Sequence, residues 1–358
     1  MEVSGGSKDQ PVGRALYCSN RLLSLIGEQV IPASFCKRVV PDDAKVNGKF
    51  IYYALKAMYD DRRITQWQVQ STGISNFQFE AFLDECEIGL PPLETQRRIA
   101  SILSAYDDLI ENNTRRIAIL EEMARRIYEE WFVRFRFPGH EQVKMVESEL
   151  GLIPEGWAVT NLDSVSEYIN RGLTPKYDDM AEGLVINQKC IRGQKLSYEL
   201  ARKQSKPIPV EKRIRYGDVV INSTGVGTLG RVAQVLDERA NCTADTHVTI
   251  VRPGSRVKTH FFGMALLALE QYFEQQGVGA TGQTELGRSR VAETVFVLPP
   301  YGLQEKFDQL IAPMRGLVIK LATKNANLRA TRDLLLPKLI SGELDVSTLP
   351  EPEEAIAA

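Results

Sequence analysis

One long helical repeat constrains this chain more than any other feature of its 358 residues. The repeat begins after Leu90-Pro91-Pro92 and continues to about Phe132, with core-type residues at alternating gaps of four and three. That spacing is typical of a coiled-coil seam. No proline or glycine interrupts roughly 39 residues, which at about 1.5 Å per residue would form a helix of roughly 58 Å. Such a helix cannot bury its apolar stripe alone and needs a partner.

A second repeat of the same kind supplies the partner. It follows Leu298-Pro299-Pro300, 208 residues after the first opening. We expect the two helices to pair antiparallel. The seam and partner-docking positions are Ile99, Leu103, Tyr106, Ile110, Asn113, Ile117 and Leu120 on the first helix, and Leu310, Met314, Leu317, Leu321 and Leu328 on the second. The polar Asn113 within this seam predicts a device that fixes the helix register at some cost in stability.

The two helix openings belong to an internal duplication. FIYYALKAM from Phe50 matches FFGMALLAL from Phe261, STGISNF from Ser71 matches ATGQTEL from Ala280, and LPPLETQ matches LPPYGLQ, always in the same order. A duplication of this kind has to be interpreted before the fold. We therefore expect an α+β fold in which two repeated mixed α/β domains are separated by two long antiparallel helices, a coiled-coil spacer with pseudo-two-fold symmetry.

The repeats also predict the domain boundaries. We expect a first α/β domain over 1–92, the first long helix over 93–137, a linker over 138–156, a second α/β domain over 157–300, the second long helix over 301–344 and a disordered acidic tail over 345–358. Residues 1–12 are polar and rich in Gly and Ser, which predicts poor order.

Composition narrows the function classes. The formal net charge is −2, so a nucleic-acid surface would have to be a local patch. The five cysteines form no CxxC pair and are odd in number, which favours reduced thiols in the cytoplasm over disulfides or a metal site. No apolar run of eighteen residues and no secretory leader is present, so we expect neither a membrane segment nor secretion.

The motifs give little support for catalysis. GVGTLG from Gly225 and GVGATG from Gly277 both fit GxGxxG, but the first leads into a strand-like alternation and the second follows a helical pattern. P-loop, HExxH and GxSxG motifs are missing, and none of the three histidines has a nearby Ser or Cys. We expect no catalytic residue, and the alternative of a nucleotide-dependent enzyme rests on the glycine motif alone.

Nucleic-acid binding has better support. Residues 170–231 contain twelve basic and six acidic side chains, a local charge of +6. Short amide and hydroxyl side chains lie among them, and such groups can contact base edges while Lys and Arg neutralise phosphates. By charge alone, a solvated, mildly basic surface would be the favoured explanation.

Several sequence runs form a recognisable combination: the two LPP openings, TGQT from Thr281, YGDVVINSTGVGTLGRVAQV from Tyr216, LEEMARRIYEEWFVRFRFPGHE from Leu120 and LRATRDLLLPKLISGEL from Leu328. Together these runs resemble the specificity subunit of type I restriction-modification systems. The resemblance extends from about Gly13 to Leu344. It implies two target-recognition domains that each read half of a bipartite site in double-stranded DNA. It also implies that the long helices set the gap between the half-sites and dock two methyltransferase subunits, with restriction subunits in the larger assembly. The chain itself would be non-catalytic and hold no cofactor, whereas the partner subunits would use S-adenosylmethionine, ATP and magnesium.

The first domain departs from this pattern. In the duplication, Gly13-Arg14 matches Gly230-Arg231. The second domain has 73 residues before Gly230, counted from Trp157, whereas only 12 residues precede Gly13, so the first domain lacks about 61. We therefore expect a truncated first domain with unpaired strand edges and an incomplete core. The alternatives are a scaffold without selective DNA recognition and a half-size subunit that works as a homodimer. We expect base reading in the second domain, with DNA contacts from Gln188, Lys189, Arg192, Lys195, Thr224, Arg231, Gln283 and Thr284.

Overall fold

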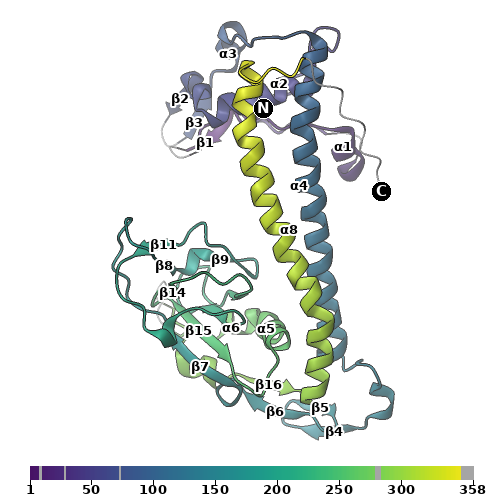
Figure 1. Ribbon diagram of the computed structural model, residues 1–358, viewed down its shortest axis with the longest axis vertical. Coiled ribbons are helices and arrows are strands. Elements are labelled where there is room, and N and C mark those ends of the chain that lie inside the picture. Colours follow the sequence, from purple (N-terminus) through teal and green to yellow (C-terminus); the bar gives the residue numbers. More distant parts are fainter. Residues whose placement is uncertain (8–9, 28–29, 72–73, 279–283, 348–358) are drawn as a thin grey trace. The chain divides into compact units, whose positions relative to one another are not determined.

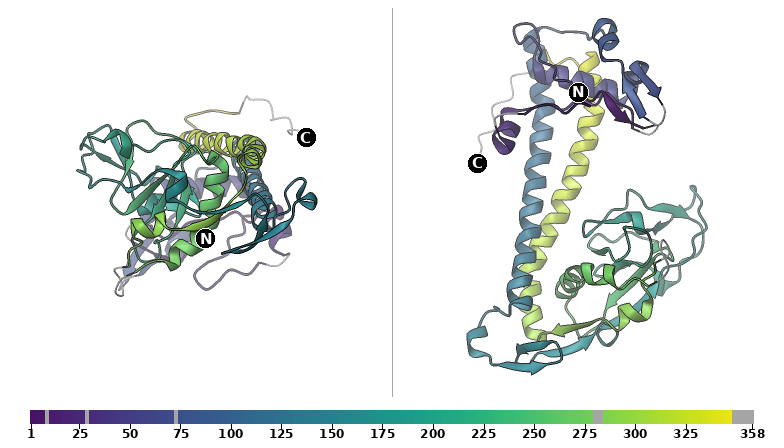
Figure 2. Two further views of the ribbon diagram at one scale, coloured as in Figure 1. Left: turned by 90° about the horizontal axis from the view of Figure 1, so that it is seen from below. Right: turned by 180° about the vertical axis from the view of Figure 1, so that it is seen from behind.

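The computed structural model describes residues 1–7, 10–27, 30–71, 74–278 and 284–347 (Figure 1). The chain divides into two compact units, one of Met1–Thr114 with the chain from Ala322 onward, the other of Arg115–Leu321. Two long helices, α4 (Leu93–Tyr128) and α8 (Tyr301–Ser341), contribute to both units (Figure 2). The predicted mixture of α/β domains and two long helices is confirmed. None of the helices in the described residues has the length and apolar character needed to cross a membrane.

The first unit combines short helices with a small antiparallel sheet of order β1-β3-β2. Asn47 caps α2, because its side chain accepts a hydrogen bond from the Phe50 backbone N–H. Phe50 is fully buried. Besides its parts of α4 and α8, the unit contains β1 (Ser4–Gly6), α1 (Asn20–Ile26), α2 (Gly48–Asp60), the 3-10 turn η1 (Arg63–Trp67), β2 (Gln68–Ser71), β3 (Ile74–Phe77) and α3 (Phe79–Glu85).

The expected poor order of residues 1–12 is wrong for the described part of that segment. β1 pairs with β3, and Val12 is fully buried. Gly13 allows this packing, because its φ is +99° and a Cβ there would lie 2.7 Å from Ile64 Cγ1. Val12 thus gives a polar, glycine-rich segment an apolar anchor in the core.

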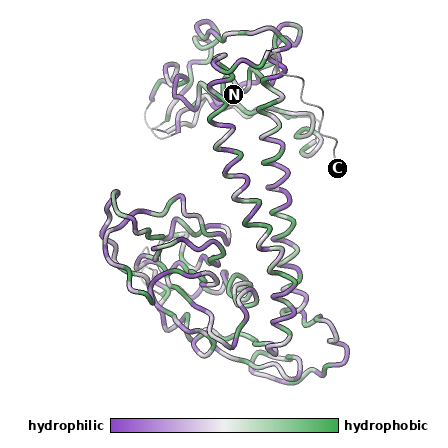
Figure 3. The backbone as a smooth tube through the Cα atoms, in the orientation of Figure 1, coloured by the Kyte–Doolittle hydropathy of each residue, from purple (hydrophilic) through white to green (hydrophobic). Residues whose placement is uncertain are grey.

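Within the first unit, α4 and α8 pair antiparallel through a buried seam. Ile99 and Leu103 pack in one cluster with Leu336 and Leu339. Figure 3 shows hydrophobic and hydrophilic residues alternating along both helices. Val346 belongs to the same cluster and is 2% exposed, although it lies in the segment expected to be a disordered tail. Its apolar side chain explains why this part of the segment is packed, and residues 348–358 of the expected tail lie outside the described residues.

An amide pair interrupts this apolar seam. Asn113 Nδ2 donates to Asn325 Oδ1 at 2.9 Å, and Asn325 Nδ2 donates to the Ile110 carbonyl and to Thr114 Oγ1, both at 3.2 Å. Asn113 is 4% exposed and Asn325 2%. The polar seam position expected from the sequence is therefore buried and hydrogen-bonded to a second asparagine, which the sequence analysis did not identify.

The second unit is built on a four-stranded antiparallel sheet of order β13-β12-β15-β7. A second sheet has the order β11-β8-β14, in which β14 runs parallel to β8. The strands are β4 (Met145–Ser148), β5 (Gly151–Pro154), β6 (Ala158–Asn161), β7 (Ser166–Arg171), β8 (Gly183–Ile186), β9 (Ile191–Arg192), β10 (Lys195–Leu196), β11 (Arg202–Gln204), β12 (Val219–Asn222), β13 (Val232–Gln234), β14 (Cys242–Ala244), β15 (Val248–Pro253) and β16 (Val295–Leu298). The segment expected to be an acidic linker contains the β4–β5 hairpin.

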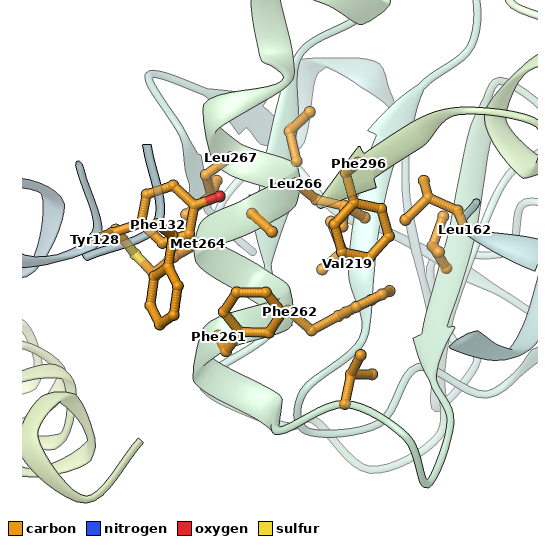
Figure 4. Close-up of a cluster of buried hydrophobic side chains, with 14 of the residues drawn as sticks. Tyr128, Phe132, Leu162, Val219, Phe261, Phe262, Met264, Leu266, Leu267 and Phe296 are labelled. Atoms are coloured by element: carbon orange, nitrogen blue, oxygen red, sulfur yellow. The ribbon is translucent and has the colours of Figure 1, made fainter. Parts of the chain in front are cut away.

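Helices cover the four-stranded sheet of this unit. They are α5 (Thr259–Ala268), α6 (Glu270–Gln275) and α7 (Arg288–Ala292), and the end of α4 continues as a π-helical turn, η2 (Glu129–Val133). The ring of Phe132 lies 4.8 Å from that of Phe261 on α5 and 4.9 Å from that of Phe307 on α8, both edge to face. Figure 4 shows Phe132 and Phe261 in this cluster together with Val219 of β12. Aromatic packing therefore fixes the four-stranded sheet to the ends of both long helices within the unit.

The duplication recurs in equivalent hydrogen bonds. In the first unit, Gln96 Oε1 accepts from the backbone N–H of Asn47, at the start of α2. In the second, Gln304 Oε1 accepts from the backbone N–H of Lys258, at the start of α5. Each glutamine also donates to the carbonyl of the first proline in its LPP sequence. The repeated glutamine therefore ties the start of a long helix to the start of a shorter one in both units.

One expected seam position on α8 is wrong. Leu310 is 41% exposed, and the following Ile311 is fully buried with Phe307. An α-helix has 3.6 residues per turn, so the buried face drifts from a strict seven-residue repeat. Leu321 is buried, and Tyr106, Ile117, Leu120, Met314, Leu317 and Leu328 are half-buried.

A buried histidine at the start of α5 predicts acid sensitivity. His260 is 6% exposed; Tyr216 Oη lies 3.5 Å from its Nε2, and its Nδ1 has no hydrogen-bond partner in the described chain. Burial, reinforced by the charge of Arg315, lowers the pKa of His260 from 6.5 to about 4. Between these values the unfolded chain binds more protons than the folded one, so stability falls as pH falls.

The His260→Gln variant should lose the part of the pH dependence of stability that His260 causes. We expect its free energy of unfolding to fall less than that of the wild type between pH 6.5 and 4, measured by urea titration at several pH values. Burial raises the pKa of the neighbouring Asp308, which acts in the opposite sense in both proteins. Parallel pH profiles for the two proteins would contradict the prediction.

Candidate nucleic-acid interface

One end of the four-stranded sheet collects polar and basic side chains. Because neighbouring strands are antiparallel, the carboxyl ends of β12 and β7 lie at the same end of the sheet as the amino ends of β13 and β15. Arg231 directly precedes β13, Thr224 follows β12, His247 directly precedes β15 and Arg171 ends β7. We call these four residues the sheet-end row. Of them, Thr224 and Arg231 were expected near DNA.

Asn222 fastens the loops on which this row depends. It is fully buried, and its Nδ2 donates to the carbonyl of Gln188 at 3.1 Å and to that of Thr228 at 3.0 Å. Gln188 begins the 3-10 turn η5 (Gln188–Cys190), so one amide holds this turn against the loop after β12. Asn222 was not among the expected site residues. The INSTG run could have indicated it, because a polar residue ends an otherwise apolar strand there.

The glycines of the GVGTLG sequence shape a tight loop between two strands. Gly225, Gly227 and Gly230 have φ values of +107°, +68° and +82°. A Cβ on Gly230 would lie 2.3 Å from the backbone nitrogen of Glu274, so only glycine fits there. The loop leads into β13 rather than into a helix, which does not fit a dinucleotide-binding site.

Hydrogen bonds hold the centre of the sheet-end row. Thr224 Oγ1 lies 2.7 Å from His247 Nδ1, and the backbone N–H of Ser223 donates to the His247 carbonyl at 2.8 Å. Arg171 Nη2 donates to Glu285 Oε1 at 2.7 Å. The backbone of Glu285 forms an isolated antiparallel β-bridge with that of Thr224. Thr284, the residue before Glu285, therefore lies near the row. Gln283, also expected near DNA, lies outside the described residues.

The remaining expected DNA contacts are distributed unevenly. Lys189 and Arg192 are exposed, and Arg231 Nη2 donates to the Gly227 carbonyl at 2.8 Å. Lys195 instead forms an ion pair with Glu121 on α4, with Nζ 2.8 Å from Oε2. A role of Lys195 at DNA stays a prediction that this ion pair does not support. In the described residues, no group of three or more His, Cys, Asp or Glu side chains is arranged to hold a metal ion.

Comparisons with known proteins agree on one family. Residues 7–122 match the type I restriction modification DNA specificity domain. The chain is 26% identical over 325 residues to the type I restriction enzyme MjaIX specificity subunit of Methanocaldococcus jannaschii, covering 87% of this chain and 72% of that protein. It is 30% identical over 167 residues to the MjaVIII specificity subunit of the same organism, covering 47% and 37%. The crystal structure of a type I S subunit from M. genitalium has the same fold, with a TM-score of 0.55, 18% identity and coverage of 83% and 74%.

Proposed function

Because the chain is similar to type I restriction enzyme specificity subunits over most of its length, we propose that it belongs to that family and is the non-catalytic subunit that selects the DNA sequence for the complex. The sheet-end row with its flanking Gln188 and Lys189 would form the recognition surface of the second unit. The main support is that Arg231, Thr224, His247 and Arg171 lie together at one end of the sheet. Hydroxyl and imidazole groups can contact base edges, while contacts from Arg to phosphates position the protein on the DNA.

The helix pair would set the gap between two half-sites and dock the partner subunits. We propose two methyltransferase subunits, together with restriction subunits in the larger assembly. S-adenosylmethionine, ATP and magnesium would act in those partners, since catalysis is assigned to them. A subunit that selects bacterial or archaeal DNA would work in the cytoplasm.

Mapping methylated adenines tests this function. We would co-express the chain with its methyltransferase partner in an unmethylated host and sequence single DNA molecules. We expect modification confined to one split motif, because each recognition domain would read one half-site. A palindromic motif would indicate that two copies of the second unit read the site. Complex formation without any methylation would contradict the proposal and favour a scaffold.

A further inference from the structure

We infer that His247 is a base-reading residue and that Thr224 sets the direction of its ring. This inference rests on the proposed function, because it names one contact within the same DNA interface. From the sequence, His247 was one of three histidines without a catalytic neighbour.

The backbone at His247 is rigidly held. Its N–H donates to Asp245 Oδ1 at 2.8 Å, and its carbonyl accepts from the Ser223 N–H at 2.8 Å. Asp245 is 4% exposed, and Val248, the first residue of β15, is fully buried. A functional side chain on a fixed backbone keeps its geometry better than one on a loose loop. The ring itself is exposed, so the fixed position faces solvent.

The ring has one nitrogen engaged and one available. Nδ1 lies 2.7 Å from Thr224 Oγ1, and Nε2 has no hydrogen-bond partner in the described chain. If Thr224 donates to Nδ1, Nε2 carries the proton and can donate to N7 or O6 of a purine. If the direction is reversed, Nε2 accepts and can bind an exocyclic amino group. Both are base-edge contacts in the major groove.

A purely structural role explains these contacts less well. The Ser223–His247 backbone bond and the Asn222 amide already hold the loop after β12. Arg171 is bound to Glu285, and Arg231 to the Gly227 carbonyl, so both guanidinium groups are positioned from within the chain. The charge of Arg171 is balanced by Glu285, whereas Arg231 is held by a neutral carbonyl, so Arg231 is the cation of the row that suits a phosphate contact beside the exposed imidazole.

Selection from a randomised DNA pool tests this inference. The full chain with its methyltransferase partner is bound to random duplexes at fixed salt, and the recovered duplexes are sequenced. We expect His247→Ala to lower the preference at one base pair by on the order of tenfold, with other positions unchanged. His247→Gln should shift the preference at that position towards adenine, since glutamine pairs with adenine N6 and N7.

Three further variants separate positioning from charge. Thr224→Val should weaken the preference at the same base pair, and Thr224→Ser, which keeps the hydroxyl, should restore it. Lys189→Ala is the matched control, because loss of a phosphate contact weakens all sequences alike and lowers the salt slope by about one. His247→Ala should leave that slope unchanged.

The possible failures are distinguishable. A wild-type motif that His247→Ala and His247→Gln both leave intact would overturn the role of His247 and leave the proposed function standing. A wild-type complex that recovers no motif would overturn the proposed function and this inference together.

Discussion

Replacing Arg252 with alanine is expected to destabilise the second unit by about 3 to 5 kcal/mol, because it would leave a buried carboxylate without its partner. Arg252 Nε donates to Asp218 Oδ1 at 2.8 Å, and Nη2 donates to Oδ2 at 2.9 Å. The side chains are 6% and 1% exposed. Arg252 also donates to the carbonyls of Glu211 and Arg213, so it fixes the segment that leads into β12.

The pKa of Asp218 shows the balance of forces at this pair. Burial raises it, and the hydrogen bonds from Arg252 oppose that shift. Without Arg252, the carboxyl group would take up a proton or the sheet would open. Amide hydrogen exchange in β12 and β15 during urea titration measures the effect, because it reports the free energy of opening in this unit.

Two variants control for charge and for packing. Arg239→Ala removes a cation from an exposed pair with Asp237, so we expect a change of less than about 1 kcal/mol. The double variant Arg252→Met/Asp218→Leu should recover most of the loss, since it removes both buried charges. A loss below 1 kcal/mol for Arg252→Ala would mean that the pair contributes little to the sheet.

Local periodicity explains which parts of the fold were predictable. The four-three spacing identified α4 and α8 because helix pairing depends on neighbours three and four residues apart. It placed the seam at Leu310 instead of Ile311, since the drift of a real helix depends on the packing partner. The strand order β13-β12-β15-β7 could not be read from the sequence, because it depends on pairings between distant segments.

The candidate site was predictable in composition but not in arrangement. Thr224 and Arg231 lie at the sheet end, and both stand out in the sequence as polar residues beside a glycine-rich turn. Only strand pairing places His247 at the same sheet end, and its partner Thr224 is 23 residues away in the sequence, so local patterns could not identify it. Lys195 looked equivalent to Lys189 in the sequence, yet its ion pair with Glu121 directs it to α4. Charge identifies candidates, and topology decides which of them converge.

Replacing Asn113 with leucine is expected to cost about 1 to 3 kcal/mol, because the Oδ1 of Asn325 would lose its only side-chain donor in the described residues while remaining buried. Asn325→Leu should lower the free energy of unfolding by at least as much, since Asn325 Nδ2 also donates hydrogen bonds to the Ile110 carbonyl and to Thr114 Oγ1. Asn112→Leu, on the adjacent exposed residue, is the control and should change stability by less than about 0.5 kcal/mol. Hydrogen exchange of α4 and α8 measures all three.

The double variant Asn113→Leu/Asn325→Leu separates stability from register. Replacing both amides with apolar groups should be nearly neutral or stabilising, so the two single losses should not add. A buried amide pair is satisfied in one register only, whereas leucines at both positions tolerate a slide of one helix along the other. If the register sets the distance between half-sites, the methyltransferase complex assembled with the double variant should methylate motifs with more than one spacer length. Additive losses together with a single, unchanged spacer would mean that the amide pair does not select the register, and that apolar packing around Leu103 and Leu336 does.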